Sequence, residues 1–304
     1  RQSCIGLYLP KLMNWLSICD YYYENDIFSE GDYSFTDLNA KFSWKLSARD
    51  RLHLNVYGGY DYTTIRDMMQ NSEYQDNSRW GNAVSSVEWE RVVSDKTSFS
   101  LTGYVTDGYA LNDETNIFEG DEEVKRSVRK SHNSSNVFDL GAVFNADTKI
   151  QHHHLRYGGT AVYHRYSPYT GREQYVVHLD GRREEKENTV VYNSMNAGEM
   201  ALYVQDKISL TDWLTVDAGL RYGIFAVKNR LYNSFEPRLA TSFNMKDDLL
   251  FKLSYSRMTQ PLHLVTSSGK DSPCNFWMPS TSRMHPMEGD QVSAEIDFRP
   301  SLKW

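Results

Sequence analysis

The most regular feature of the chain is an alternation of apolar and polar residues between Leu214 and Gly223. The even positions of this segment are apolar, and the odd positions are polar or glycine. Neighbouring side chains of a strand point to opposite faces, so a period of two predicts a β-strand with one apolar and one polar face. The apolar positions are Leu214, Val216, Ala218, Leu220 and Tyr222.

The same alternation recurs along the chain and predicts eleven strands, which are joined by links that are alternately short and long. The predicted strands are 36–46, 51–62, 81–91, 99–105, 138–144, 155–163, 200–204, 214–223, 236–245, 249–256 and 291–298. The long polar links, predicted as loops, are 63–79, 106–135, 166–196, 224–234 and 257–290. The second of these contains the run GDEEVKRSVRKS, which we interpret as a solvated loop.

Two architectures use such strands. A soluble sandwich turns its apolar faces inward to form a core, whereas a membrane barrel turns them toward lipid and keeps a polar lumen. A regular succession of short and long links is typical of an up-and-down barrel, which has tight turns at one rim and long loops at the other. A Greek-key sandwich has no reason to keep that order. The pattern therefore favours an all-β, antiparallel, up-and-down transmembrane β-barrel.

Aromatic residues on the apolar faces support the barrel, because their rings settle where hydrocarbon meets lipid headgroups and form a girdle at each rim. Those near the long links are Tyr60, Tyr62, Phe138, Tyr163, Tyr222, Phe235 and Tyr255. Those near the short turns are Trp44, Trp89 and Phe99, and Trp213 lies in a turn. The opposite face is expected to line a wet lumen, with Asp37, Lys41, Asp217, Arg221, Glu236, Arg238 and Lys252.

Composition agrees with a barrel but does not decide the question alone. The mean hydropathy is −0.62, as expected where half of each strand faces water. The 304 residues carry a net charge of −7, which argues against a nucleic-acid partner. No apolar run is long enough to predict a transmembrane helix. Cys4, Cys19 and Cys274 lack the spacing of a zinc or redox motif.

No pattern in the sequence predicts catalysis, a cofactor or a metal site. The run His152–His154 is adjacent in sequence, so its side chains would alternate between strand faces and not converge on a metal ion. His263, Cys274 and His285 share one long link but show no ligand spacing. Nucleophile-elbow, zinc-protease, P-loop and dinucleotide-binding motifs are missing from the sequence. We therefore predict that the chain is not an enzyme.

Several short motifs resemble the barrel domain of TonB-dependent outer-membrane receptors, in particular those of Bacteroidetes. ALYVQD at 201–206 is similar to the YxQD strand of that family, and AGLRY at 218–222 to its GLRY strand. EPRL at 236–239 is similar to the PRL strand, which LSYSR at 253–257 follows after a polar turn. PCNFWMP at 273–279 resembles a Pro-rich, Trp-containing loop of the Bacteroidetes members.

This resemblance implies a receptor of the outer membrane whose barrel has about 22 strands closed around a plug. Residues 34–304 are then expected to form about eleven of those strands, with further strands on both sides, while residues 1–33 form a loop or partial strand. No plug domain or energy-coupling box is recognised in the chain. The implied partners are outer-membrane lipid, the TonB system acting through a plug outside this chain, a ligand and a surface lipoprotein.

The implied activity is uptake of a scarce nutrient, such as an iron chelate, cobalamin or a glycan. Phe276 and Trp277 are candidate ligand contacts, because an exposed ring can stack on a sugar or an aromatic chelator. Arg221 and Arg238 are further candidates from the lumen face. Two alternatives stay open: a passive outer-membrane porin or adhesin, and a soluble extracellular β-sandwich that binds carbohydrate.

Overall fold

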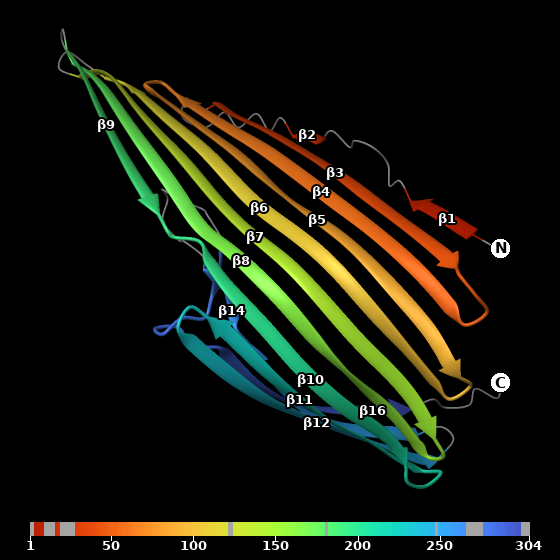
Figure 1. The fold of residues 1–304 in the computed structure, drawn as a ribbon. Helices are drawn as coiled ribbons and strands as arrows, with labels where there is room; N and C mark the ends of the chain where they lie inside the picture. Colours follow the sequence, from red (N-terminus) through yellow and green to blue (C-terminus); the bar gives the residue numbers. More distant parts are fainter. Residues whose placement is uncertain are drawn as a thin grey trace, which may run out of the picture.

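The computed structural model describes residues 3–8, 16–18, 28–120, 124–179, 182–246, 249–265 and 276–298. These residues form one antiparallel sheet of 14 strands and a separate two-stranded hairpin (Figure 1). In the described residues, no helix is long and apolar enough to cross a membrane. The predicted ligand residues Phe276 and Trp277 are described, whereas Cys19 and Cys274 lie outside the described residues.

Strands follow one another through the sheet in chain order, each antiparallel to the next. The eleven long ones are β3 (Phe28–Lys45), β4 (Asp50–Met69), β5 (Ser72–Ser94), β6 (Thr97–Glu119), β7 (Val124–Ile150), β8 (His153–Leu179), β10 (Met195–Ser209), β11 (Leu214–Val227), β12 (Arg230–Lys246), β13 (Leu249–Gln260) and β16 (Met287–Phe298). Shorter strands are β1 (Ser3–Tyr8) and β2 (Leu16–Ile18), which pair with β3, and β9 (Arg182–Val191), which pairs with β8. The separate hairpin consists of β14 (Leu262–Val265) and β15 (Phe276–Pro279).

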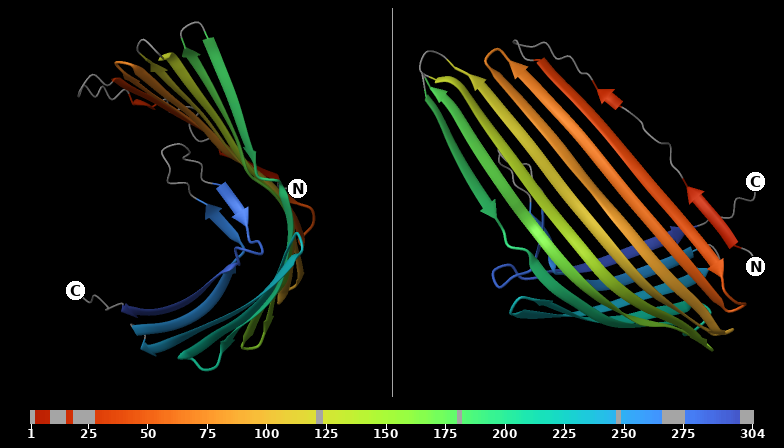
Figure 2. Two further views of the ribbon diagram at one scale, coloured as in Figure 1. Left: turned by 90° about the vertical axis from the view of Figure 1, so that its left-hand side faces the viewer. Right: turned by 45° about the horizontal axis from the view of Figure 1, so that its top comes forward.

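The eleven predicted strands and their up-and-down order are confirmed. The sheet curves strongly, and among the described strands its order runs from β1 to β16 without closing (Figure 2). We call the concave side, where the β14–β15 hairpin lies, the inner face and the convex side the outer face. Strand β3 begins at Phe28, upstream of the expected start, and the division into 1–33 and 34–304 stays a prediction.

The prediction of long polar loops is wrong at four of the five long links. β4 runs on to Met69 and β5 starts at Ser72, so only two residues connect them. β6 and β7 likewise extend across most of the charged link, and β8 with β9, and β11 with β12, form similar extended hairpins. Backbone pairing continues here, but both faces lie among polar groups, so the period-two signal disappears although the strand does not.

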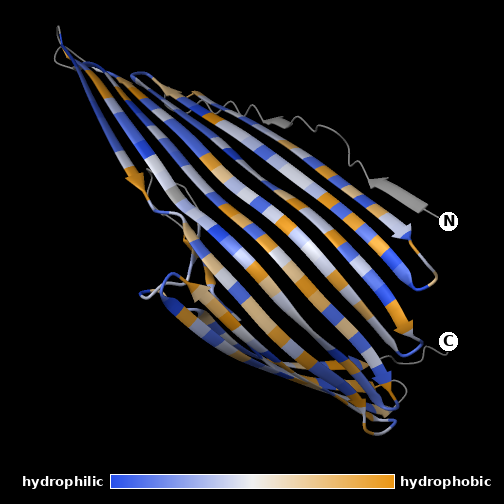
Figure 3. Ribbon diagram, viewed as in Figure 1, coloured by the Kyte–Doolittle hydropathy of each residue, from blue (hydrophilic) through white to orange (hydrophobic). Residues whose placement is uncertain are grey.

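Apolar side chains of the outer face form an exposed belt, not a core. Leu202 is 72% exposed, and few apolar residues of the described chain are fully buried. Along each strand these residues alternate with polar residues of the inner face, as lipid outside and water inside require (Figure 3). No second described sheet covers the belt, so the sandwich hypothesis is wrong.

Aromatic contacts mark the short-turn rim of this belt. Trp89 packs edge-on against Phe99 at 5.3 Å between ring centroids, and Phe99 lies 6.0 Å from Phe144. In the later strands, Phe243 lies 6.3 Å from Trp213 and 6.0 Å from Phe251. Aromatic rings at one level in neighbouring strands are what an interfacial girdle predicts.

At the end of the belt opposite the short turns, toward the tips of the long hairpins, the outer face carries charged pairs. Arg66 lies on the same face as Tyr62, four residues further along β4, and its Nη2 is 2.7 Å from Glu73 Oε1. Arg79 bonds Asp113, which also bonds His132, across β5, β6 and β7. Partial burial pushes the pKa of Asp113 up, but the hydrogen bonds from His132 and Arg79 outweigh it and hold that pKa below its usual value.

Candidate functional site

A chain of ionic contacts crosses the inner face from β7 to β12. Arg221 of β11 sits between two carboxylates, with Nη2 3.1 Å from Glu199 Oε1 and Nη1 3.2 Å from Glu236 Oε1. His164 of β8 continues the chain, with Nδ1 2.7 Å from Asp139 and Nε2 3.8 Å from Glu199. The Glu236 side chain is only 3% exposed, so its charge depends on these partners.

Two of the predicted ligand residues therefore differ in their surroundings. Arg221 faces inward as predicted, but two carboxylates already compensate its charge. The Arg238 side chain is 52% exposed and touches Glu236 only at 3.9 Å, which leaves it open toward the lumen side. A role in ligand contact stays a prediction for both residues.

The hairpin β14–β15 carries the other two predicted residues; hydrogen bonds of Ser280 close its base, and a hydrogen bond from Tyr232 ties it to strand β12. The Ser280 hydroxyl bonds the carbonyl of Pro261 at 2.9 Å and the His263 ring at 3.0 Å. The Tyr232 hydroxyl donates to the carbonyl of Thr281 at 2.5 Å. Strand β15 packs against β8 and β7, so the chain folds back over the sheet instead of projecting away from it.

The side chains of Phe276 and Trp277 have different neighbours and do not form one shared contact surface. The ring of Phe276 stacks on Tyr192 at 6.4 Å. Trp277 is exposed and lines a cavity of about 400 Å³ together with Leu262 and residues of β5, β6 and β7. Of these two residues, Trp277 lines a described cavity that could admit a ligand, and its ligand role stays a prediction.

A second cavity, of about 450 Å³, lies near the tips of the long hairpins and was missed by the sequence interpretation. We call it the upper cavity. Its lining comes from links that were predicted to be loops, so no pattern pointed to it. Its walls include Asp67, Met69, Ser72, Tyr74, Asn116, Phe118, Ser127, Arg129, Tyr175 and Val177.

Histidine side chains do not assemble a metal centre in the described part of the chain, where no group of three or more potential metal ligands is found. His153 bonds Asp206 and His154 bonds Asp147, each across to a different strand. His263 is bonded to Ser280, and His285 lies edge-on against the Tyr232 ring. The third candidate of that loop, Cys274, lies outside the described residues.

Comparison with known proteins gives one family and several similar folds. The profile of the family described as TonB dependent receptor-like, beta-barrel, matches residues 15–300. No curated protein sequence matches the chain. The ferric preacinetobactin receptor BauA of Acinetobacter baumannii aligns with a TM-score of 0.51 at 9% identity, over 90% of this chain and 45% of that one.

Two further structures are similar at the level of the fold. The RagAB peptide importer aligns with a TM-score of 0.50 at 9% identity, over 89% of this chain and 39% of that one. The pyoverdine receptor FpvA of P. aeruginosa gives 0.47 at 12% identity, over 90% and 44%. The chain therefore spans less than half the length of each of these three proteins.

Proposed function

The chain belongs to the TonB-dependent receptor β-barrel family, and on this basis we propose that it forms part of a receptor that imports a scarce nutrient. Members of this family are outer-membrane transporters and not enzymes, and this chain is an outer-membrane protein. The proposed receptor would work with the TonB system through a plug that lies outside this chain. Its long hairpins would face the cell exterior, as the longer loops of such barrels do.

The observation that carries the proposal is the opposite chemistry of the two faces of one sheet. Leu202 and its neighbours form an exposed apolar belt on the outer face, while Arg221 and Glu236 form an ion pair on the inner face. Burying that charge toward lipid would be costly, so the inner face supports a water-filled passage. The hairpin β14–β15 lies on the concave side of the sheet and would narrow this passage (Figure 2).

We further propose that the receptor is of the Bacteroidetes type. The support is the order of four motifs along the barrel, namely 201–206, 218–222, 236–239 and 273–279. The ligand of such a receptor would be an iron chelate, cobalamin or a glycan, and a surface lipoprotein would be a further partner. Trp277 and Arg238 are the predicted ligand contacts that the fold leaves accessible.

Energy dependence of uptake tests this proposal against the passive porin or adhesin. The gene of the full-length receptor would be deleted in its host, and uptake of labelled cobalamin, iron chelates and oligosaccharides measured with and without a functional TonB. We expect one ligand class to lose uptake equally on deletion of the receptor and on loss of TonB. Receptor-dependent uptake that continues without TonB would instead support the passive alternative.

A further inference from the structure

The upper cavity is built by a regular grid of inner-face side chains above the belt. Strand register places Tyr74 beside Asn116, Asn116 beside Arg129, and Arg129 beside Tyr175. The next row toward the tips contains Ser72, Phe118, Ser127 and Val177 in the same order. Four strands thus present one continuous surface, on rigid hairpins instead of loose loops.

Apolar groups face inward here, which reverses the arrangement in the belt. Phe118 is 49% exposed, and Met69 and Tyr175 are exposed beside it. On the outer face of the same hairpins, Arg66 and Glu73 form an ion pair. Exposed aromatic surface above the membrane gains nothing from lipid, so a gathered patch of it indicates a binding surface.

The polar groups of the cavity are charged but compensated. Arg129 Nη2 lies 2.8 Å from Glu173 Oε1, and the guanidinium sits over the Tyr175 ring at 5.5 Å from its centroid. Asp67 adds a carboxylate to the lining. Burial, followed by the nearby charges of Asp76 and Glu114, raises the pKa of Tyr74, so its hydroxyl remains a donor.

This balance of charge discriminates between ligands. A strongly anionic iron chelate requires uncompensated cations, yet the guanidinium of Arg129 is already paired with Glu173, and Asp67 adds a negative charge to the same lining. A neutral ring that carries hydroxyl groups fits both parts of the surface. Its C–H face suits the negative face of an aromatic ring, and its hydroxyls suit paired donors and acceptors.

Resting on the proposed function, we propose that the upper cavity is the capture site for a neutral glycan. Successive sugar rings of one oligosaccharide would stack on Tyr175 and Phe118 and bond Arg129 at one end of the row, while a ring at the other end would bond Asp67. The volume of about 450 Å³ falls within the range of small-ligand sites and accommodates a short oligosaccharide segment. Trp277 lines a separate cavity, so this site adds to the predicted contacts and does not restate them.

Binding to the purified full-length receptor in detergent tests this proposal. The probes are neutral malto-, cello-, manno- and xylo-oligosaccharides, with a ferric tris-catecholate as the anionic competitor. We expect calorimetric binding of at least one neutral probe, weakened at least about tenfold by Tyr175→Ala, because central aromatic contacts dominate binding energy. Tyr175→Phe keeps the ring and the stacking, so its affinity should change less than about threefold.

Controls separate a binding defect from a folding defect and from failure of the receptor hypothesis. Arg66→Gln lies on the outer face of the same hairpins and should leave affinity unchanged. Binding only of the ferric probe, no binding of any neutral probe, or equal affinity in Tyr175→Ala would each overturn the glycan site. If uptake still depends on TonB in those cases, the proposed function stands and only the glycan site fails. If a glycan binds as expected but its uptake does not depend on TonB, the glycan site stands and only the proposed function fails.

Discussion

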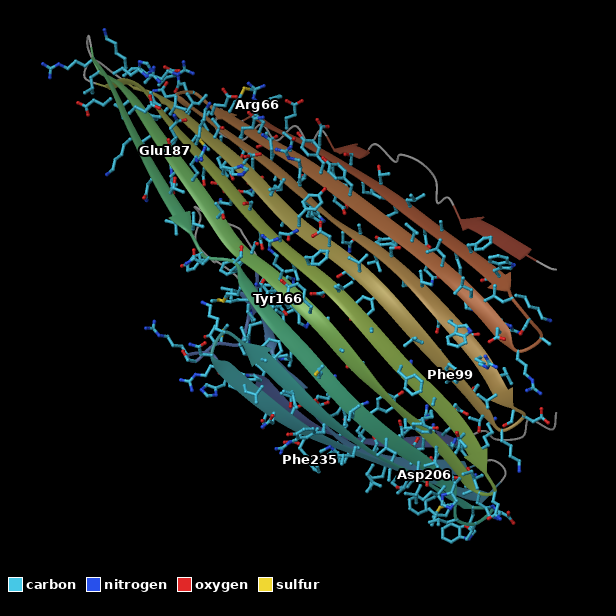
Figure 4. All side chains as sticks on the ribbon, in the orientation of Figure 1. Arg66, Phe99, Tyr166, Glu187, Asp206 and Phe235 are labelled. Atoms are coloured by element: carbon cyan, nitrogen blue, oxygen red, sulfur yellow. The ribbon has the colours of Figure 1, made fainter. Side chains whose placement is uncertain are left out.

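The two halves of the sheet share one membrane belt but differ in height. In the first half, from β3 to β9, strands β7 and β8 have 27 residues each. In the second half, from β10 to β16, β11 has 14 residues and β13 has 12. A bilayer requires about 9–11 residues of a tilted strand, so the excess of the first half lies beyond the hydrocarbon. Figure 4 shows Arg66 and Glu187 near the hairpin tips of the first half, whereas Phe99 and Asp206 lie toward the opposite, short-turn end of the sheet.

The inner faces of the two halves also differ. The tall half keeps an open cavity between hairpin tips, with Phe118 and Tyr175 exposed. In the short half, Phe225 and Val227 are buried in a small cluster with Tyr166 of β8, and Leu262 of the folded-back hairpin packs against it. The belt is therefore common to both halves, whereas the tall half adds the inner surface above it that lines the proposed capture site.

The largest expected effect comes from charging the belt of the short half. Leu239 is exposed midway along the belt of β12, between Phe235 and Phe243. Leu239→Arg places a charge at the bilayer midplane, so it should lower the free energy of unfolding by about 3 kcal/mol and strongly reduce the folded fraction. Heat-modifiable gel mobility of the full-length receptor measures that fraction. The matched control, Val128→Arg, lies above the belt in the tall half, and a similar loss there would contradict the difference in height.

A second, smaller effect is expected from the inner ionic chain of the short half. Arg221→Met removes the cation between Glu199 and Glu236 and leaves the buried Glu236 charge with weaker partners. The free energy of unfolding should fall by about 2 kcal/mol, measured by urea titration in detergent. Adding Glu236→Gln should restore part of this loss, because the uncompensated charge is then removed. No recovery in the double variant would mean that the pair is not coupled.

A third test asks whether the short-turn girdle is equal in both halves. Trp89 contacts Phe99 in the tall half, and Trp213 contacts Phe243 in the short half. Each tryptophan-to-alanine substitution should lower the free energy of unfolding by about 1 kcal/mol, because it removes the ring contact. Urea titration compares the two variants under identical conditions. Because Trp89 also donates a hydrogen bond from Nε1 to Asp50 Oδ1 at 3.2 Å, a much larger loss of stability at Trp213 than at Trp89 is the result that would show that the halves do not sit at a common interface.

The sequence predicted the belt well because lipid enforces one strict pattern. Leu214 to Tyr222 alternates with polar residues since only one face meets hydrocarbon, and Arg221 was placed inward for that reason. Above the belt both faces of the sheet meet water, so neither face is required to be apolar. His132 faces out and Arg129 faces in, yet both are polar, so the continuing strand β7 resembled a solvated loop.

The candidate site was less predictable because it depends on register. Arg129 and Tyr175 become neighbours only through the pairing of β7 with β8, which includes a shift between Ser134 and Asn136. Glu199 reaches Arg221 through the pairing of β10 with β11. Alternation identifies which face a residue occupies, but it does not say which residue lies beside it.

The smallest expected effect concerns the outer face of the tall half and its dependence on pH. Asp113 bonds Arg79 and His132, and its pKa in the fold is below the ordinary value. A carboxyl with a lowered pKa stabilises the fold above its unfolded pKa of about 3.9, and this contribution is lost as pH falls through the folded pKa. Asp113→Asn should therefore cost about 0.5 kcal/mol at pH 7 and almost nothing at the acid end of the titration. Urea titrations of both proteins across that range measure the difference, and a constant difference would mean that the Asp113 charge does not stabilise the hairpins.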